Sequence, residues 1–244
     1  MKKYLFFILI LVFTCCKSKN TNEETTTISE EQTGEGEKIT QGPEYDRGLL
    51  EIVPRPYNIE SYFLLLPQEV LGVGIEERNA ILESRDSARI TTQGGCYNNL
   101  DVLNYEGGYM SYSCHGDGGG EIVEITYWKR EDNTHLIAVN KISYGMCCDE
   151  SYVEFLTFTE DNWEIVTKEV FPDIKLPAFI DVTYLTEEDM DKMAPLLISL
   201  PLKGKNIIVK PGGEIGESGY NGDINSIKIE SIELVWNNIN FINE

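Results

Sequence analysis

Apolar and polar residues first follow a helical period. Over residues 58–71 the apolar positions recur three or four residues apart, which predicts an amphipathic helix that Asn58 caps and Pro67 interrupts. A second short helix is predicted over residues 75–82, with its apolar residues toward the core and its charged residues, Arg78 among them, toward the solvent. The sequence therefore predicts short helices ahead of the first strand.

From residue 109 the period changes to two, the period of a β-strand with one buried face. A glycine-rich run at 116–120 and polar runs at 131–134 and 159–162 separate the alternating segments, and such short runs favour tight turns. Strands joined in this way form an antiparallel meander. The predicted strands cover residues 109–114, 122–128, 136–144, 152–158 and 163–170.

The C-terminal part of the chain has a mixed pattern. Thr186 begins a predicted helix that runs to about Leu197. The phase of the last predicted strand slips near Glu230, which indicates a β-bulge or a break. No internal repeat is evident, so the expected fold class is α+β, with short N-terminal helices, an antiparallel β-meander sheet, one further helix and C-terminal strands. Those strands are predicted at residues 198–202, 206–210 and 227–236.

Residues 1–14 have the layout of an export signal. Lys2 and Lys3 precede an uncharged apolar run at residues 4–13. As a helix this run spans about 15 Å, roughly half of the hydrocarbon core of a bilayer, so it is too short for a lasting membrane span. We therefore expect a signal peptide that is removed from the mature chain.

Two cysteines follow the apolar run directly. Val12 lies three residues before Cys15, and polar residues begin after Cys16. This segment resembles the lipobox of bacterial lipoproteins, and with the polar stretch after it resembles lipoproteins of Bacteroidetes-type bacteria. The resemblance implies an exported protein that carries acyl chains such as palmitate on Cys15, or alternatively on Cys16. We expect it at the outer membrane, on the periplasmic face or the cell surface; a secretory signal cut after Thr14 is the alternative.

Residues 15–46 are expected to form the lipidated cysteine and a disordered acidic tether, because they contain almost no large apolar residues that could offset the entropy of ordering. A flexible coil of this length spans roughly 30 Å, enough to hold a domain clear of lipid headgroups. Residues 47–244 have the length of a single globular domain. The domain is thus expected to meet the membrane through its lipid anchor alone.

The chain is strongly acidic, with 41 Asp and Glu against 20 Lys and Arg and a formal net charge of −21. Removal of Lys2 and Lys3 with the signal takes this charge to −23. Such a charge repels nucleic acid phosphates and anionic lipid headgroups, so neither is expected as a partner. A cationic protein fits the charge better, although solvation alone also accounts for acidity.

Four cysteines remain in the domain, and an even number in an oxidising compartment predicts disulfide bonds. Adjacent residues of an extended segment point to opposite faces, so Cys147 and Cys148 are expected to pair with Cys96 and Cys114 rather than with each other. The alternative is a zinc site built from these four thiols and His115. The ligand spacing of a zinc knuckle is missing, because the candidate ligands stand as adjacent pairs, and no Cys-x-x-Cys redox motif is present.

The usual catalytic motifs are missing from the sequence. It contains two histidines, His115 and His135, and no Gly-x-Ser-x-Gly elbow, His-Glu-x-x-His helix, phosphate-binding loop or EF-hand. His135 stands at the head of an apolar strand and is expected to be structural. No catalytic residue and no cofactor is therefore assigned.

Aromatic residues recur along the predicted meander. Most are expected to pack in the core or in cross-strand pairs, whereas an exposed row of them would bind glycan or protein. The residues concerned are Tyr109, Tyr112, Tyr127, Trp128, Tyr144 and Tyr152.

The anchor, the tether, the acidity and the missing motifs together favour one interpretation. It is a lipid-anchored envelope protein whose domain is a non-catalytic binding module for a protein or other macromolecule, with a cationic protein or a glycan as partner. The alternative is a hydrolase with dispersed carboxylates, which would need a cleft with two facing acids. A Cys/His zinc protein is a third alternative.

Overall fold

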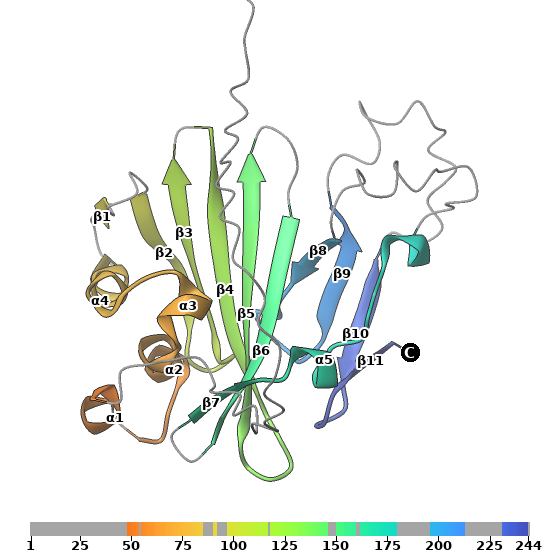
Figure 1. Ribbon diagram of the computed structural model, residues 1–244, viewed down its shortest axis with the longest axis horizontal. Helices are drawn as coiled ribbons and strands as arrows, with labels where there is room; N and C mark the ends of the chain where they lie inside the picture. The colour runs from red at the N-terminus through yellow and green to blue at the C-terminus, as the bar shows by residue number, and fades with distance from the viewer. Residues whose placement is uncertain are drawn as a thin grey trace, which may run out of the picture. The chain divides into compact units, whose positions relative to one another are not determined.

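The computed structural model describes residues 48–53, 55–84, 90–91, 97–116, 118–145, 150–159, 162–179, 196–212 and 231–243, all within one compact unit, residues 40–244. Its strands form two antiparallel sheets, and short helices lie beside the larger sheet (Figure 1). The α+β prediction is confirmed, because the described residues are mostly antiparallel sheet with a few helices. The predicted signal peptide, lipidated cysteine and tether lie outside the described residues.

The larger sheet is a meander whose described strands lie side by side in chain order. Its centre is the pair of β4 and β5, which are in antiparallel register along their whole length. This is the arrangement that the period-two pattern predicts. The strands are β1 (Ile90–Thr91), β2 (Tyr97–Asn104), β3 (Tyr109–Gly116), β4 (Gly119–Lys129), β5 (His135–Gly145), β6 (Glu150–Thr159) and β7 (Asn162–Ile165).

Two parts of this sheet differ from the predictions. The sequence pattern misses β2, because the strand is rich in asparagine and a register shift between Leu100 and Val102 breaks its alternation. The strand predicted over residues 163–170 is wrong beyond Ile165, since Thr167–Val170 is the short helix α5. The hydroxyl of Thr167 accepts a hydrogen bond from the backbone N–H of Phe155 at 2.9 Å, which takes the place of the next strand pairing.

Short helices cover one face of the meander, next to β2, β3 and β4 (Figure 1). The side chain of Asn58 accepts a hydrogen bond from the backbone N–H of Ser61 at 2.9 Å and so caps α2, as the sequence predicts. Pro67 separates α2 from α3, and Gly72, with φ of 78°, ends α3. The helices are α1 (Leu49–Ile52), α2 (Ile59–Leu65), α3 (Gln68–Leu71) and α4 (Ile75–Glu83).

The core beneath the helices is apolar and fully buried. Side chains from α2, α3 and α4 pack against one face of the three central strands of the meander, β3, β4 and β5, and the burial of each such side chain stabilises the fold by about 1.5–3 kcal/mol. Its members include Ile59, Phe63, Leu65, Leu71, Ile81, Met110, Tyr112, Val123, Ile125, Ile137 and Val139.

The expectation that Arg78 faces the solvent is wrong. Arg78 is 3% exposed, and its guanidinium donates hydrogen bonds to the backbone carbonyls of Phe63, Leu64 and Leu66 at the end of α2 and of Val73 before α4. These carbonyls have no partner within their own helix or turn, so the planar fork of one arginine satisfies several of them at once. Burial lowers the pKa of Arg78 to about 10, which leaves the guanidinium charged at neutral pH.

The smaller sheet packs on the opposite face of the meander, with strand order β11-β10-β9-β8 (Figure 1). The sequence pattern finds β9 but not β11, and β8 already begins at Leu196, where a helix is predicted to end. The rest of that predicted helix and residues 213–230, with the start of the last predicted strand, lie outside the described residues. The strands are β8 (Leu196–Ser199), β9 (Ile207–Pro211), β10 (Ile232–Trp236) and β11 (Phe241–Asn243).

A second core lies between the two sheets. Aromatic rings dominate it, and the ring centroids of Trp128 and Phe241 are 5.1 Å apart in an edge-to-face contact. The other buried members include Leu136, Ala138, Phe155, Phe179, Ile207, Val209, Leu234 and Trp236. Within the described part of the chain, no helix is both long and apolar enough to cross a membrane.

We predict that Arg78→Met lowers the free energy of unfolding by about 3 kcal/mol or more, because the carbonyls at the end of α2 lose their donors inside the core. Urea unfolding of the purified domain measures the change. Glu76→Ala on the exposed side of the same helix serves as the control and should stay within about 0.5 kcal/mol of the native chain. A loss as small as that of the control would show that the arginine is dispensable.

Candidate functional site

A groove of about 510 Å³ lies between the two sheets, at the end where β5 and β9 finish. The side chains of Ile122, Ile142 and Leu197 give it an apolar wall and are only half-buried. Its volume falls within the range of about 300–1,000 Å³ that is common for ligand pockets. The remaining lining residues are Tyr144, Gly145, Ile198, Ser199 and Lys210.

A polar junction below this groove fixes β8 against the meander. One carboxylate oxygen of Glu124, Oε2, accepts hydrogen bonds from Asn140 Nδ2 at 2.9 Å and from the backbone N–H of Leu200 at 3.1 Å. Its other oxygen, Oε1, accepts from the hydroxyl of Tyr109 at 2.9 Å. Asn140, which is fully buried, also donates to the backbone carbonyl of Ile198 at 2.7 Å. Charged hydrogen bonds of this kind are about twice as strong as neutral ones.

The backbone of Ile198 in the groove wall is held from a second side. Its N–H donates to Ser151 Oγ at 3.0 Å, and the Ser151 hydroxyl lies 3.4 Å from the carbonyl oxygen of Ile198. Together with Asn140, the serine thus satisfies both polar groups of Ile198 on the side that faces the meander. The wall of the groove therefore has a fixed backbone and little spare hydrogen-bonding capacity at this point.

A row of hydrogen-bonded side chains runs across the meander beside the groove. The hydroxyl of Tyr144 bonds to Nδ1 of His115, Nε2 of His115 lies 3.0 Å from Ser113 Oγ, and the Ser113 hydroxyl donates to Asp101 Oδ1 at 3.0 Å. A carboxylate only accepts, so Ser113 donates its proton to Asp101, and Nε2 of His115 donates to the serine oxygen.

A glycine lets this row form. Gly120 of β4 lies in register between His115 of β3 and Tyr144 of β5. A β-carbon at Gly120 would stand 2.3 Å from the Tyr144 hydroxyl oxygen and 2.4 Å from the carbonyl oxygen of Cys114. The tyrosine ring therefore covers the bare backbone of a strand glycine, which is a known way to rescue a glycine in a sheet.

The row contains serine, histidine and aspartate, but not in a catalytic order. In a hydrolase triad the histidine lies between the carboxylate and the serine and takes the serine proton. Here Ser113 lies between Asp101 and His115 and gives its proton to the carboxylate. Ser113 is also 2% exposed, so no substrate carbonyl reaches its oxygen. The arrangement aligns Tyr144 and does not activate a nucleophile.

His135, the second histidine, lies in a separate aromatic cluster. Its Nδ1 bonds to the hydroxyl of Tyr62, which is 4% exposed, and its ring centroid is 4.8 Å from that of Tyr127. Burial, and then the positive charge of Lys129, lower the pKa of His135. Burial raises the pKa of Tyr62, so the phenol keeps its proton and donates it to the imidazole. These contacts agree with the structural role that the sequence predicts for His135.

The cysteines of the predicted disulfide and zinc sets are described only in part. Cys114 is half-buried in β3 and is disulfide-bonded. Cys96, Cys147 and Cys148 lie outside the described residues, so the predicted pairing and the alternative zinc set stay predictions. His115 follows Cys114 on the strand and therefore points to the other face of the sheet, where it bonds to the row beside the groove. Among the described residues, no three His, Cys, Asp or Glu side chains form a metal-binding cluster.

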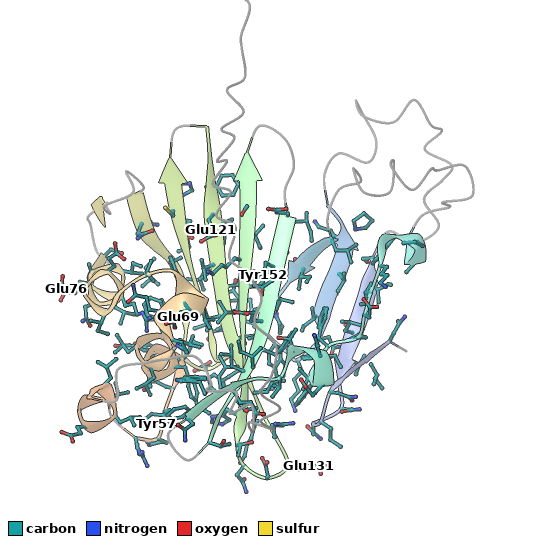
Figure 2. The ribbon with its side chains drawn as sticks, viewed as in Figure 1. Tyr57, Glu69, Glu76, Glu121, Glu131 and Tyr152 are labelled. Carbon is teal, nitrogen blue, oxygen red and sulfur yellow. The ribbon has the colours of Figure 1, made fainter. Side chains whose placement is uncertain are left out.

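The aromatic residues of the meander do not form one exposed row. Tyr109, Tyr112 and Trp128 are buried in the two cores, and Tyr127 packs beneath the helices. Figure 2 shows Tyr152 on β6 in the upper part of the sheet; it is 62% exposed and bonds to Glu154. Alternation along the strands directs Tyr144 to the groove face and Tyr152 to the face that bears the helices.

Comparison with known proteins supports the architecture only. No family model and no curated protein matches the chain. Among solved structures, it is similar to a domain of an uncharacterized protein from Porphyromonas gingivalis W83, with 15% sequence identity and a TM-score of 0.51. The similarity covers 76% of this chain and 97% of the other. At this identity the likeness concerns the fold alone.

We predict that Gly120→Ala costs about 1–3 kcal/mol and breaks the bond between Tyr144 and His115, because the added methyl group meets the tyrosine hydroxyl. Thermal unfolding measures the first effect, and the ring ¹⁵N shifts of His115 report the second. Gly116→Ala is the matched control, since the nearest atom to its added carbon is 3.9 Å away. Equal effects of the two substitutions would contradict the packing argument.

We also predict that His135 makes stability fall with acidity. Its folded-state pKa is lowered, so the unfolded chain binds more protons, and the stabilisation present above about pH 6.5 is lost as the pH falls toward the folded-state pKa. Urea unfolding at about pH 7 and about pH 5.5 should show a steeper loss in the native chain than in His135→Gln, whose side chain does not titrate. Parallel losses would mean that His135 takes no part.

Proposed function

We propose that this chain is a lipid-anchored protein of the bacterial envelope and that its domain is a non-catalytic binding module whose ligand site is the groove between the sheets. One observation carries the proposal: the groove exposes the apolar side chains of Ile122, Ile142 and Leu197 beside β8, where no described residue of the buried core covers them. Covering half-buried apolar side chains of this kind removes apolar surface from water, which makes binding of a partner favourable.

The rest of the chain supplies the setting of this site. In the proposal, Cys15 carries the acyl anchor at the outer membrane, and residues 15–46 form the tether. The finer arrangement also belongs to it, in which short helices lead into the meander and a helix that ends before Leu196 precedes the C-terminal strands. The partner is a protein or another macromolecule, and no cofactor is required.

The acidic residues support a cationic protein as the partner of the outer surface rather than of the groove. Figure 2 shows Glu69 and Glu76 on two helices, Glu121 on β4 and Glu131 in the turn that follows β4. They are spread over several elements, so they act as a field that attracts a basic surface and not as one pocket. Lys210 lines the groove itself and repels a cation there.

A carboxylate-based hydrolase is less well supported. Neither carboxylate of the hydrogen-bonded groups near the groove is among its described lining residues, and both are engaged: Oδ1 of Asp101 accepts from Ser113 and Asn99, and Glu124 accepts three hydrogen bonds through its two oxygens. A glycosidase needs one acid that protonates a leaving group and a second that attacks or activates water. Both carboxylates here hold structure in place.

The proposal predicts a partner at the groove in the living cell. A photoreactive phenylalanine analogue at Leu197, on the groove wall, should crosslink the full anchored chain to one macromolecule of defined mass. The same analogue at Ile239, which is 58% exposed in the segment between β10 and β11, is the matched control and should give at least tenfold less of that product. Ile142→Asp should remove the product from Leu197. Equal products at both positions, or none at Leu197, would reject the groove as the binding site.

A further inference from the structure

We infer that the groove binds a single acyl chain that ends in a carboxylate, with its hydrocarbon against Ile122, Ile142 and Leu197 and its head at Lys210. The inference rests on the proposed function, because it names the ligand chemistry of that same groove. Three observations support it. The polar groups of Ile198 and Tyr144 are already hydrogen-bonded, Lys210 is the one charged residue among the described lining residues, and the groove has the volume of a small-molecule pocket.

The polar groups of Ile198 and Tyr144 in the wall are already hydrogen-bonded. The N–H of Ile198 donates to Ser151, its carbonyl accepts from Asn140 and Ser151, and the hydroxyl of Tyr144 bonds to Nδ1 of His115. A peptide strand or a sugar that entered here would bring N–H, C=O or O–H groups that lose their water and find few partners, which costs about 1–3 kcal/mol for each group. A hydrocarbon brings no such groups, so the wall selects it.

The β8 backbone gives a second reason against a peptide. A peptide that extends a sheet needs a strand edge with unpaired N–H and C=O groups. On β8 one side pairs with β9, and the other side meets Ser151 and Asn140 through Ile198 and Glu124 through Leu200. The edge that adjoins the groove is thus closed to strand addition.

The charge of the lining selects the head group. Lys210 is exposed and is the one charged residue among those that line the groove in the described part of the chain. Its four-carbon stem adds apolar surface, and its ammonium attracts one negative charge at the mouth. A carboxylate at the end of a chain matches a lone lysine beside an apolar wall.

The size of the groove limits the ligand to one chain. A volume of about 510 Å³ lies in the middle of the range of small-molecule pockets and well below what a complete multi-chain lipid needs. Each methylene that leaves water should improve the affinity roughly three- to fourfold while the chain still fits. The affinity should therefore rise with chain length and then level off.

The test uses the chain from residue 17 onward, which keeps the whole compact unit and lacks only the signal and anchor segment. Binding of the fluorescent fatty acid cis-parinaric acid is measured, followed by its displacement with saturated fatty acids of rising length and with the alcohols of equal length. We expect displacement to strengthen three- to fourfold per methylene and the acid to bind at least tenfold better than its alcohol.

Two lysine variants complete the test. Lys210→Met keeps the apolar stem and should weaken the acid at least tenfold while leaving the alcohol unchanged. Lys203→Met, at an exposed position between β8 and β9, is the matched control and should change neither. The comparison of acid with alcohol on the native chain does not depend on the folding of any variant.

The outcomes separate this inference from the proposed function. Absence of probe binding, equal affinity for acid and alcohol, or equal displacement by a neutral oligosaccharide would each overturn the fatty-acid assignment. If the crosslink from Leu197 in cells persists in that case, the groove is still a binding site and its ligand is of another class. If both fail, the groove has no ligand and the proposed function fails with the inference.

Discussion

The structure depends most on the partly buried contact between Glu124 and Asn140. A carboxylate placed between two sheets is costly unless donors surround it, and here it receives one from Asn140, one from Tyr109 and one from the backbone of Leu200. The cost is still visible, because Oδ1 of Asn140 has no donor among the described residues. This contact fixes the position of β8, because it holds the strand at one register against β4 and β5. Apolar packing alone specifies such a register poorly.

The groove follows from that position. Below the junction of Glu124 and Asn140, large aromatic and aliphatic residues fill the space between the sheets. Above it, the inward positions of the meander hold Ile122, Ile142 and then Gly120 with Tyr144 folded across it. Gly120 contributes no side chain, and the ring of Tyr144 extends over this glycine toward His115 and does not fill the groove. The apolar side chains of Ile122 and Ile142 are therefore left only half-buried at this end.

The sequence predicts the meander well, because strands that alternate between apolar and polar residues and are joined by short polar turns carry their own signal. It predicts the site poorly, for reasons visible in particular residues. Glu124 alternates with Val123 and Ile125 and so looks like a solvent-facing residue, although Ile122 and Trp128 on the same face hinted at a second layer. The prediction that Arg78 is exposed is wrong for a similar reason: its partners are backbone carbonyls, and the sequence does not show which carbonyls lack a partner.

The acidity of the chain and a groove that selects an anion are compatible because they act over different distances. At physiological ionic strength the field of exposed charges falls off within about 8 Å, so a ligand feels the net charge of −21 weakly until it is close. Among the described residues that line the groove, Lys210 alone carries a charge. In the proposed function, the net charge would keep the domain away from anionic headgroups, while one local cation would select the ligand that enters the groove.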